Sequence, residues 1–236
     1  MDELTFVKTL TTDQPFVPKY FPVDVEINKK GAGSFHDGID GVLRISNNFP
    51  LEKNTTMIDT RHAPAFRNGH IKGAINLQDG DHFETWLGAI INPDEQFYLI
   101  AANDEDLDTV IEKIAKIGYE QHIKAALLPP ATMTIKSSEM DLNDFKSSPE
   151  KYTIVDVRNH GETEEGLVFG HALTVPLPEL RERVSEIPTD KPIVVHCAAG
   201  YRSAAAVSII SAKITTVPVY DLGEAVIEIG NLKSEV

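Results

Sequence analysis

The sequence is poor in cysteine, in cationic residues and in long apolar runs, and each shortage excludes a class of protein. Its one cysteine, Cys197, has no partner for an internal disulfide and cannot build a multi-thiolate zinc site. No apolar run is long enough, without charge or proline, to form a transmembrane helix. The 22 Lys and Arg residues face 36 Asp and Glu, and the net charge of −14 disfavours nucleic acid and anionic membranes as partners.

The start of the chain also lacks the features of a secretory signal, because residues 1–4 carry no basic charge and no apolar core follows them. The composition is otherwise that of an ordinary globular protein, with 42% hydrophobic and 25% charged residues. We therefore expect a cytoplasmic protein. Its 236 residues suit one large domain or two small ones.

Two parts of the chain look like degenerate copies of one another. Each copy has an apolar strand that ends in Asp-x-Arg, then a Gly-His pair, then a second apolar strand that leads into a helical pattern. The paired segments are 56–61 and 153–158, 69–70 and 170–171, and 97–101 and 192–196. The helical patterns cover 104–117 and begin again near residue 202. Short apolar strands that alternate with helices predict an α/β fold with parallel sheets covered on both faces.

The repeat divides the chain into three units. We expect an N-terminal arm at 1–45, a first domain at 46–135 and a second domain at 136–236, which begins with a polar linker that holds a short helix. Three prolines within residues 15–22 remove hydrogen-bond donors and fix φ, so this stretch cannot form a regular helix. We predict that it is an extended arm that packs against another part of the protein.

The loop with the one cysteine follows the second apolar strand of the second domain. Ligands of open α/β sheets bind at the carboxyl ends of strands, where this loop begins. The loop residues are Cys197, Ala198, Ala199, Gly200, Tyr201 and Arg202. Three small residues let the backbone curl round one atom, and a helix opens immediately afterwards. Loop amides and the positive end of the helix dipole then form a cradle for an anion: a thiolate, a persulfide or a substrate oxyanion. Such surroundings favour the nucleophilic thiolate form of cysteine.

This loop resembles the active-site loop of rhodanese-type sulfurtransferases, and Asp156-Val157-Arg158 and Gly170-His171 resemble the strand-end and Gly-His motifs of that fold. The resemblance implies two rhodanese-like domains, each a mostly parallel sheet flanked by helices on both faces. It implies that Cys197 takes a sulfane sulfur from a small donor and passes it to a thiol acceptor.

The resemblance also assigns roles to the neighbours of the cysteine. The amides from Ala198 to Arg202 hold the persulfide, the Arg202 side chain orients the loop or an anionic donor, and Tyr201 forms a wall of the pocket mouth. Asp156 and Arg158 support the site as an ion pair at the sheet edge. His171 and His196 are expected to be packed or hydrogen-bonded rather than catalytic.

The first domain has the scaffold without the nucleophile. At the place of the loop it reads Ala-Ala-Asn-Asp-Glu-Asp over 101–106, with no Cys and no Arg. Asn103 is suited to cap a helix, and three acidic residues in the first turn repel a bound anion. We therefore predict that the first domain is catalytically inactive and has a structural or docking role.

The N-terminal arm, with its Pro-Lys-Tyr-Phe-Pro at 18–22, resembles the tail of a metallo-β-lactamase-fold persulfide dioxygenase. The resemblance implies that a metallo-β-lactamase-fold domain is a partner of this chain. The His-x-His-x-Asp-His metal motif is absent from the sequence, so we expect no metal and no other cofactor.

Two other functions stay open at this point. Phosphatases and arsenate reductases also use a Cys-to-Arg loop, but with five intervening residues, whereas this loop has four. The chain could also be a non-catalytic interaction module with a vestigial cysteine. The sequence leaves open whether the donor is thiosulfate or a low-molecular-weight persulfide, whether the acceptor is a thiol or cyanide, and which oligomeric state the protein adopts.

Overall fold

The computed structural model describes residues 1–12, 16–46, 48–130 and 135–234. These residues form two four-stranded parallel sheets, in the strand orders β2-β1-β3-β4 and β6-β5-β7-β8. The first sheet holds β1 (Thr56–Asp59), β2 (Ile75–Asn76), β3 (Phe97–Ile100) and β4 (Ile123–Leu127). The second holds β5 (Thr153–Asp156), β6 (Leu173–Thr174), β7 (Ile193–His196) and β8 (Val219–Asp221). The shared strand order confirms that the sequence repeat is a repeat of structure.

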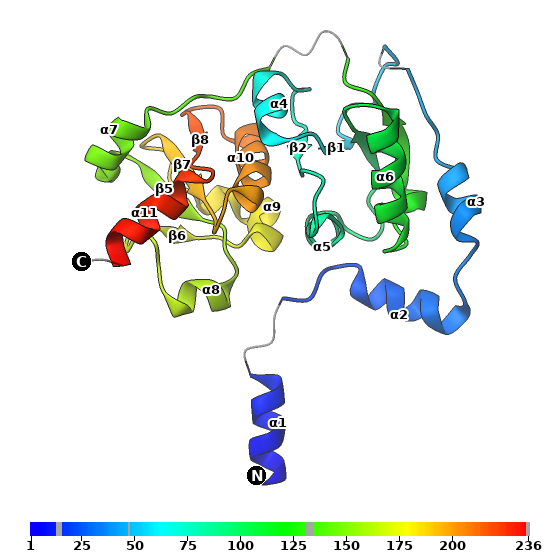
Figure 1. Cartoon of the computed structure of the whole chain (residues 1–236), viewed down its shortest axis with the longest axis horizontal. Helices are drawn as coiled ribbons and strands as arrows, with labels where there is room; N and C mark the ends of the chain where they lie inside the picture. The colour runs from blue at the N-terminus through cyan, green and yellow to red at the C-terminus, as the bar shows by residue number, and fades with distance from the viewer. Residues whose placement is uncertain (13–15, 47, 131–134, 235–236) are drawn as a thin grey trace.

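Helices lie against both sheets, as the α/β prediction requires (Figure 1). In the N-terminal segment and the first domain they are α1 (Glu3–Thr11), α2 (Phe21–Lys30), α3 (Phe35–Asp40), α4 (Ala63–Asn68), α5 (Phe83–Ile90) and α6 (Asp104–Ala115). In the second domain they are α7 (Leu142–Ser147), α8 (His160–Glu165), α9 (Leu180–Arg183), α10 (Tyr201–Lys213) and α11 (Ala225–Ser234). Short 3₁₀ helices complete the fold: η1 (Glu120–His122), η2 (Pro149–Lys151), η3 (Leu177–Glu179) and η4 (Val184–Glu186).

Each sheet has two inner strands, and of these β3 and β7 are buried along their whole length. Their residues are apolar on both faces, apart from His196, because helices cover both sides of a parallel sheet. β7 pairs with β5 through Val195 opposite Val155, and with β8 through Val195 opposite Asp221. Its carboxyl end therefore lies at the middle of the sheet edge, between two neighbouring strands.

The local signals read from the sequence are present in the structure. Asn103 caps α6, since its side chain accepts a hydrogen bond from the Asp106 amide at 2.9 Å. The apolar face of α6 is buried, and Gly118 beyond its end has a φ of 66°. A short helix, α7, lies in the expected linker.

The two domains share one hydrophobic core and a set of polar contacts. The Ser208 hydroxyl of α10 accepts a hydrogen bond from the Asn76 amide at 3.0 Å. The Arg181 guanidinium donates to both oxygens of Glu95, at 2.7 and 2.8 Å, and to the Ile90 carbonyl at 2.9 Å. Burial raises the pKa of Glu95, but the hydrogen bonds from Arg181, Thr56 and the Asn92 amide, together with the Arg181 charge, hold the pKa below its ordinary value. These contacts fix the first domain against α9, which holds Arg181, and α10, which holds Ser208 and follows the cysteine loop.

The N-terminal segment differs in part from the extended arm that its prolines predict. Helix α2 begins at Phe21 with Pro22 in its first turn, where proline loses no hydrogen bond. Pro15 lies outside the described residues. Phe16 stacks on Trp86, with ring centroids 5.4 Å apart, and the Lys19 amide donates to the Gly88 carbonyl at 2.8 Å. This part of the arm packs against the first domain, as predicted.

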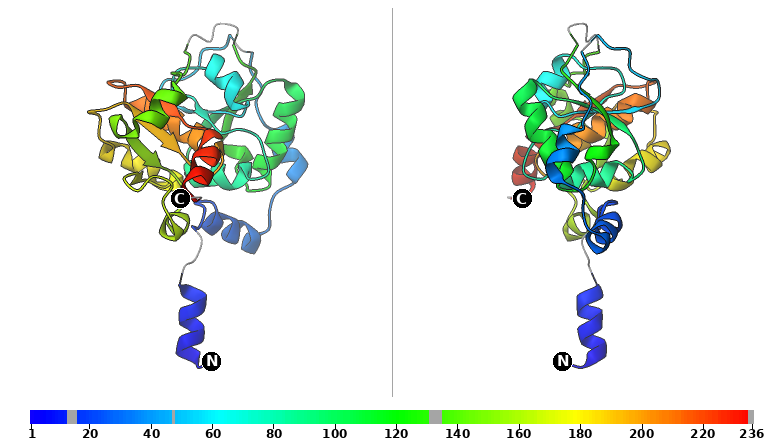
Figure 2. Two further views of the ribbon diagram at one scale, coloured as in Figure 1. Left: turned by 60° about the vertical axis from the view of Figure 1, so that its left-hand side comes forward. Right: turned by 90° about the vertical axis from the view of Figure 1, so that its right-hand side faces the viewer.

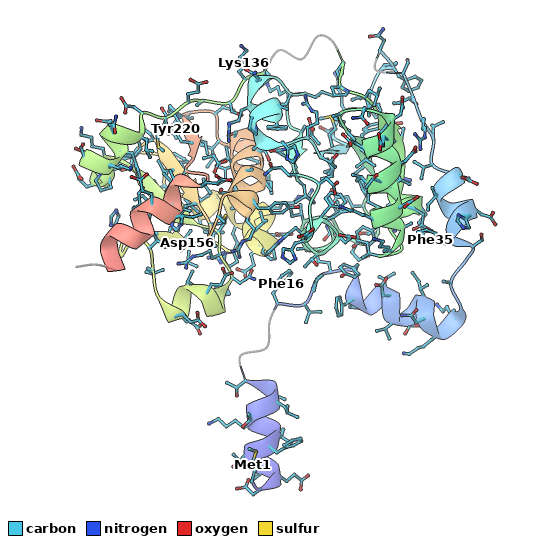
Figure 3. The ribbon with its side chains drawn as sticks, in the orientation of Figure 1. Met1, Phe16, Phe35, Lys136, Asp156 and Tyr220 are labelled. Carbon is cyan, nitrogen blue, oxygen red and sulfur yellow. The ribbon has the colours of Figure 1, made fainter. Side chains whose placement is uncertain are left out.

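Helix α1 stands apart from the two domains (Figures 1 and 2). It buries none of its residues, and it exposes Leu4, Phe6, Val7 and Leu10. Figure 3 shows Met1 at its far end and Phe16 where the arm reaches the folded body. Among the described residues, no helix is both long and apolar enough to cross a membrane.

Candidate active site around Cys197

Cys197 is the first residue after β7, and only 1% of its surface is exposed. The Gly200 amide donates a hydrogen bond to the Cys197 Sγ across 3.2 Å. Helix α10 begins at the next residue, Tyr201, so its positive end lies at the loop. The predicted order of strand, cysteine, small loop and helix is therefore the observed one, with at least one amide aimed at the sulfur.

Gly200 has a backbone conformation and a packing position that only glycine suits. Its φ is 93°, in the left-handed region that disfavours residues with a Cβ. A Cβ at this position would lie 3.0 Å from the Gly223 carbonyl carbon and 3.1 Å from the Glu224 nitrogen. The loop thus rests directly on the backbone that follows β8, and this contact holds the Gly200 amide beneath the sulfur.

Arg202 is held inside the site, with 11% of its side chain exposed, rather than lying free on the surface. Both terminal nitrogens donate to the Glu162 carboxylate, with an Nη2–Oε1 distance of 2.7 Å. The guanidinium carbon also lies 5.2 Å from the centre of the Trp86 ring, a cation–π arrangement. Burial lowers the pKa of Arg202, but the bonds with Glu162 and the neighbouring Cys197 outweigh burial and raise it.

Glu162 is a site residue that the sequence reasoning missed. It belongs to α8, where its Oε2 also accepts a hydrogen bond from the Asn159 amide at 3.0 Å and completes a capping box. The hydrogen bond from Arg202 lowers the pKa of Glu162 below its ordinary value. The Asn-x-x-Glu spacing signals the capping box, but nothing local signals the contact with Arg202.

Tyr201 ties the loop to the first domain. Its hydroxyl donates to the Gln78 carbonyl at 2.6 Å, and burial raises its pKa above the ordinary value. Tyr201, Ala199 and Gly200 line a cavity of about 940 Å³ between the two domains, so Tyr201 is a cavity wall. Neither Cys197 nor Arg202 lines this cavity. The thiol thus lies beneath the loop, outside this cavity.

Asp156 and Arg158 form the expected ion pair. The Arg158 Nη2 lies 2.7 Å from the Asp156 Oδ2 and also donates to the Gly166 carbonyl at 2.9 Å. The first domain repeats this geometry at Asp59 and Arg61, where the same distances are 2.7 and 2.9 Å. The pair therefore ties down the segment after the first strand in both domains of this chain.

The histidines show one agreement and one difference. His196 is fully buried, and its Nε2 lies 3.7 Å from the Asp156 carboxylate, so it is packed as expected. His171 is exposed instead of packed, whereas its counterpart His70 stacks on Phe66 with ring centroids 3.9 Å apart. The described residues contain no group of three or more His, Cys, Asp or Glu side chains placed to hold a metal ion.

These observations define a pair of parallel α/β domains, one of which presents a cysteine loop at the carboxyl end of an inner strand. The profile of the rhodanese-like domain matches the chain twice, at residues 48–126 and 141–225, which is more than half of its length. The chain belongs to the rhodanese-like domain family.

Several known proteins are similar to parts of the chain. A protein of Bacillus subtilis strain 168, described as uncharacterized protein YqhL, is 32% identical over 94 residues, which are 40% of this chain and 64% of that protein. A rhodanese-related protein from Thermoplasma volcanium is 31% identical with a TM-score of 0.34, over 38% of this chain and 90% of that one. A metallo-beta-lactamase from Staphylococcus aureus is 26% identical with a TM-score of 0.44, over 55% of this chain and 36% of that one. The chain thus spans less than two thirds of the length of both the Bacillus and the Staphylococcus proteins.

Proposed function

We propose that the chain is a sulfurtransferase that carries a sulfane sulfur on Cys197. The observation that carries this proposal is the Gly200 amide aimed at the Cys197 Sγ across 3.2 Å, beside the start of α10. A hydrogen-bond donor at that distance stabilises a thiolate and, after sulfur transfer, the persulfide anion. Membership of the rhodanese-like domain family supports the same assignment.

The proposed reaction has two redox-neutral steps. The Cys197 thiolate attacks the sulfane sulfur of a persulfide or of thiosulfate, an S–S bond forms to Cys197, and the donor's S–S bond breaks to release a thiolate or sulfite. A thiol or cyanide then attacks the outer sulfur, and the thiolate of Cys197 is regenerated. The chain's residues need to hold only anionic sulfur, which the loop amides and Arg202 are placed to do.

The remaining loop residues take supporting roles in this proposal. Ala198 and Ala199 contribute backbone amides, and their small side chains leave the loop free to curl. Tyr201 anchors the loop to the first domain through its bond to the Gln78 carbonyl. We assign the catalytic unit to residues 136–236 and the inactive unit to residues 46–135, where Asn103 caps a helix in place of the loop.

Intact mass spectrometry tests the proposal directly, because the chain has one cysteine and any thiol adduct belongs to it. Wild-type protein should gain the mass of one sulfur atom from a persulfide or thiosulfate and lose it on addition of cyanide or a thiol. Cys197→Ser should gain nothing, since a hydroxyl is far less ionised and cannot hold a sulfane sulfur. A wild type that takes sulfur from no donor would refute the proposal.

A non-catalytic role is the second candidate, and the observation in its favour is the burial of Cys197, which is 1% exposed. The rate of Cys197 alkylation by iodoacetamide separates the two functions. A sulfurtransferase needs a thiol that small reagents reach rapidly, whereas a vestigial cysteine reacts only as fast as the protein unfolds. A phosphatase activity would instead be detected as hydrolysis of an aryl phosphate.

We also propose that the N-terminal segment, residues 1–45, connects the chain to a metallo-β-lactamase-fold domain. The support is the set of exposed apolar side chains on α1, which the two domains leave uncovered. The test is co-sedimentation of such a domain with the chain. Replacement of Leu4 and Val7 by Ser should abolish the association if α1 is the contact.

A further inference from the structure

The charge of the cysteine loop is neutralised within the protein. Arg202 is the loop's only cation, and both of its terminal nitrogens bind the Glu162 carboxylate. The pair is largely buried, with 11% of the Arg202 side chain and 35% of the Glu162 side chain exposed. An anion that approaches the loop therefore meets an arginine whose charge is balanced by a carboxylate bonded to it.

Other cations on the elements around the site are also in ion pairs. Arg158 pairs with Asp156 at 2.7 Å, Arg181 pairs with Glu95 at 2.7 Å, and Lys19 pairs with Glu182 at 3.2 Å. None of these three side chains supplies an excess positive charge to a bound donor.

The cavity that Ala199, Gly200 and Tyr201 line is acidic. Its lining includes the exposed carboxylates of Asp81, Glu139 and Glu224. Among the described lining residues, Arg67 is the only Lys or Arg, and it lies 3.6 Å from the Asp221 carboxylate. With a net charge of −14 on the chain, the surroundings of the loop repel multiply charged anions.

We infer that Glu162 sets the donor specificity of this site, and that the site takes sulfur from an organic persulfide of single negative charge in preference to dianionic thiosulfate. This inference rests on the proposed sulfurtransferase function and names its substrate class. A persulfide anion and the Cys197 thiolate give the Cys197 persulfide and the thiolate of the donor. The released thiolate carries one negative charge. Thiosulfate leaves as sulfite, with two negative charges beside the Glu162 carboxylate.

Two donors of the same chemistry and different charge test the inference. Methanethiosulfonate and thiosulfate both offer a sulfane sulfur on a sulfonyl group, but the first is a monoanion and the second a dianion. In a two-step reaction with cyanide as acceptor, kcat/KM for the donor reports only the first step. The ratio of the two kcat/KM values is measured for wild type, Glu162→Gln and the control Glu164→Gln. Glu164 is an exposed acid on the same helix, so its replacement also removes one negative charge, but from an exposed position.

Glu162→Gln should shift the ratio toward thiosulfate by about tenfold, the effect of one elementary charge within roughly 6–10 Å at an intermediate effective dielectric constant. Glutamine keeps an oxygen that can accept the Asn159 amide hydrogen bond, so the capping box survives. Glu164→Gln should leave the ratio within about twofold, as expected for an exposed charge in salt. Equal ratios in wild type and Glu162→Gln overturn the inference, as does an equal shift in both variants.

Alkylation of Cys197 provides a second measurement that does not depend on turnover. Iodoacetamide is neutral and iodoacetate is a monoanion, and both alkylate a thiolate by the same reaction. Glu162→Gln should raise the rate with iodoacetate relative to iodoacetamide, and Glu164→Gln should not; an unchanged relative rate counts against the inference. If no donor loads Cys197, the proposed function fails and this inference fails with it. If both donors load it and the ratios do not change, only this inference fails.

Discussion

Replacement of Gly200 by Ala tests whether the loop backbone is held as tightly as its geometry indicates. At a φ of 93°, a residue with a Cβ is strained by about 1–3 kcal/mol. The added Cβ would also lie 3.0 Å from the Gly223 carbonyl carbon, where relief of an overpacked contact costs about 1 kcal/mol or more. The expected loss of unfolding free energy is therefore about 2–4 kcal/mol.

The same change should impair sulfur binding beyond its effect on stability. Relief of the contact with Gly223 moves residue 200 away from the strand end, and its amide then leaves the 3.2 Å position beneath the Cys197 sulfur. We expect the folded fraction of Gly200→Ala to accept sulfur more slowly than wild type. Urea unfolding gives the first quantity, and the rate of mass gain under native conditions gives the second.

Gly170→Ala is the matched control, since a Cβ at Gly170 meets no atom within 4 Å and the backbone there has no positive φ. It should keep wild-type loading and a stability within about 1 kcal/mol of wild type. If Gly200→Ala matches this control in both measurements, the argument from loop geometry is wrong.

Three further predictions concern charged and titratable groups. Arg202→Ala should lower kcat/KM by about one to two orders of magnitude while persulfide still forms. The double variant with Glu162→Gln should recover part of this loss. An unchanged rate in Arg202→Ala would show that Arg202 has only a structural role. Arg181→Ala should cost about 2 kcal/mol in urea unfolding because it removes the cation paired with the largely buried Glu95 carboxylate, whereas Arg183→Ala, whose partners Glu179 and Glu186 are exposed, should cost less than about 1 kcal/mol. Burial lowers the pKa of His70 below its ordinary value of 6.5, so the unfolded state takes up the proton first and stability should fall as pH drops below about 6.5. His70→Gln should reduce that dependence, and an unfolding free energy that rises with acidity would show that the sign is wrong.

The features that the sequence predicts well are those set by neighbouring residues. The strand before Cys197, the glycine at position 200 and the Asn103 cap all follow from local spacing, and the structure has each of them. The shared strand order of the two sheets follows from the internal repeat. Such local and repeated signals require no knowledge of which segments meet in space.

The contacts that the sequence does not predict join distant segments. Glu162 lies 40 positions from Arg202, and Trp86 comes from the other domain. The start of α2 at Phe21 was missed for a different reason, because Pro22 is compatible with a first helical turn although it would break a later one. In each case tertiary packing or position within the helix decided the outcome, and composition did not.

The stacked group of Phe16, Trp86 and Arg202 has a practical consequence for experiments on this protein. Trp86 is the only tryptophan of the chain, and its ring faces Arg202 at 5.2 Å and Phe16 at 5.4 Å. The tryptophan fluorescence of the unmodified protein, excited selectively over its six tyrosines, therefore comes from one place, where the first domain, the N-terminal segment and the cysteine loop meet. A change of emission on sulfur loading reports movement at the loop, and a change on removal of the N-terminal segment reports its departure from the first domain, in both cases without an added label.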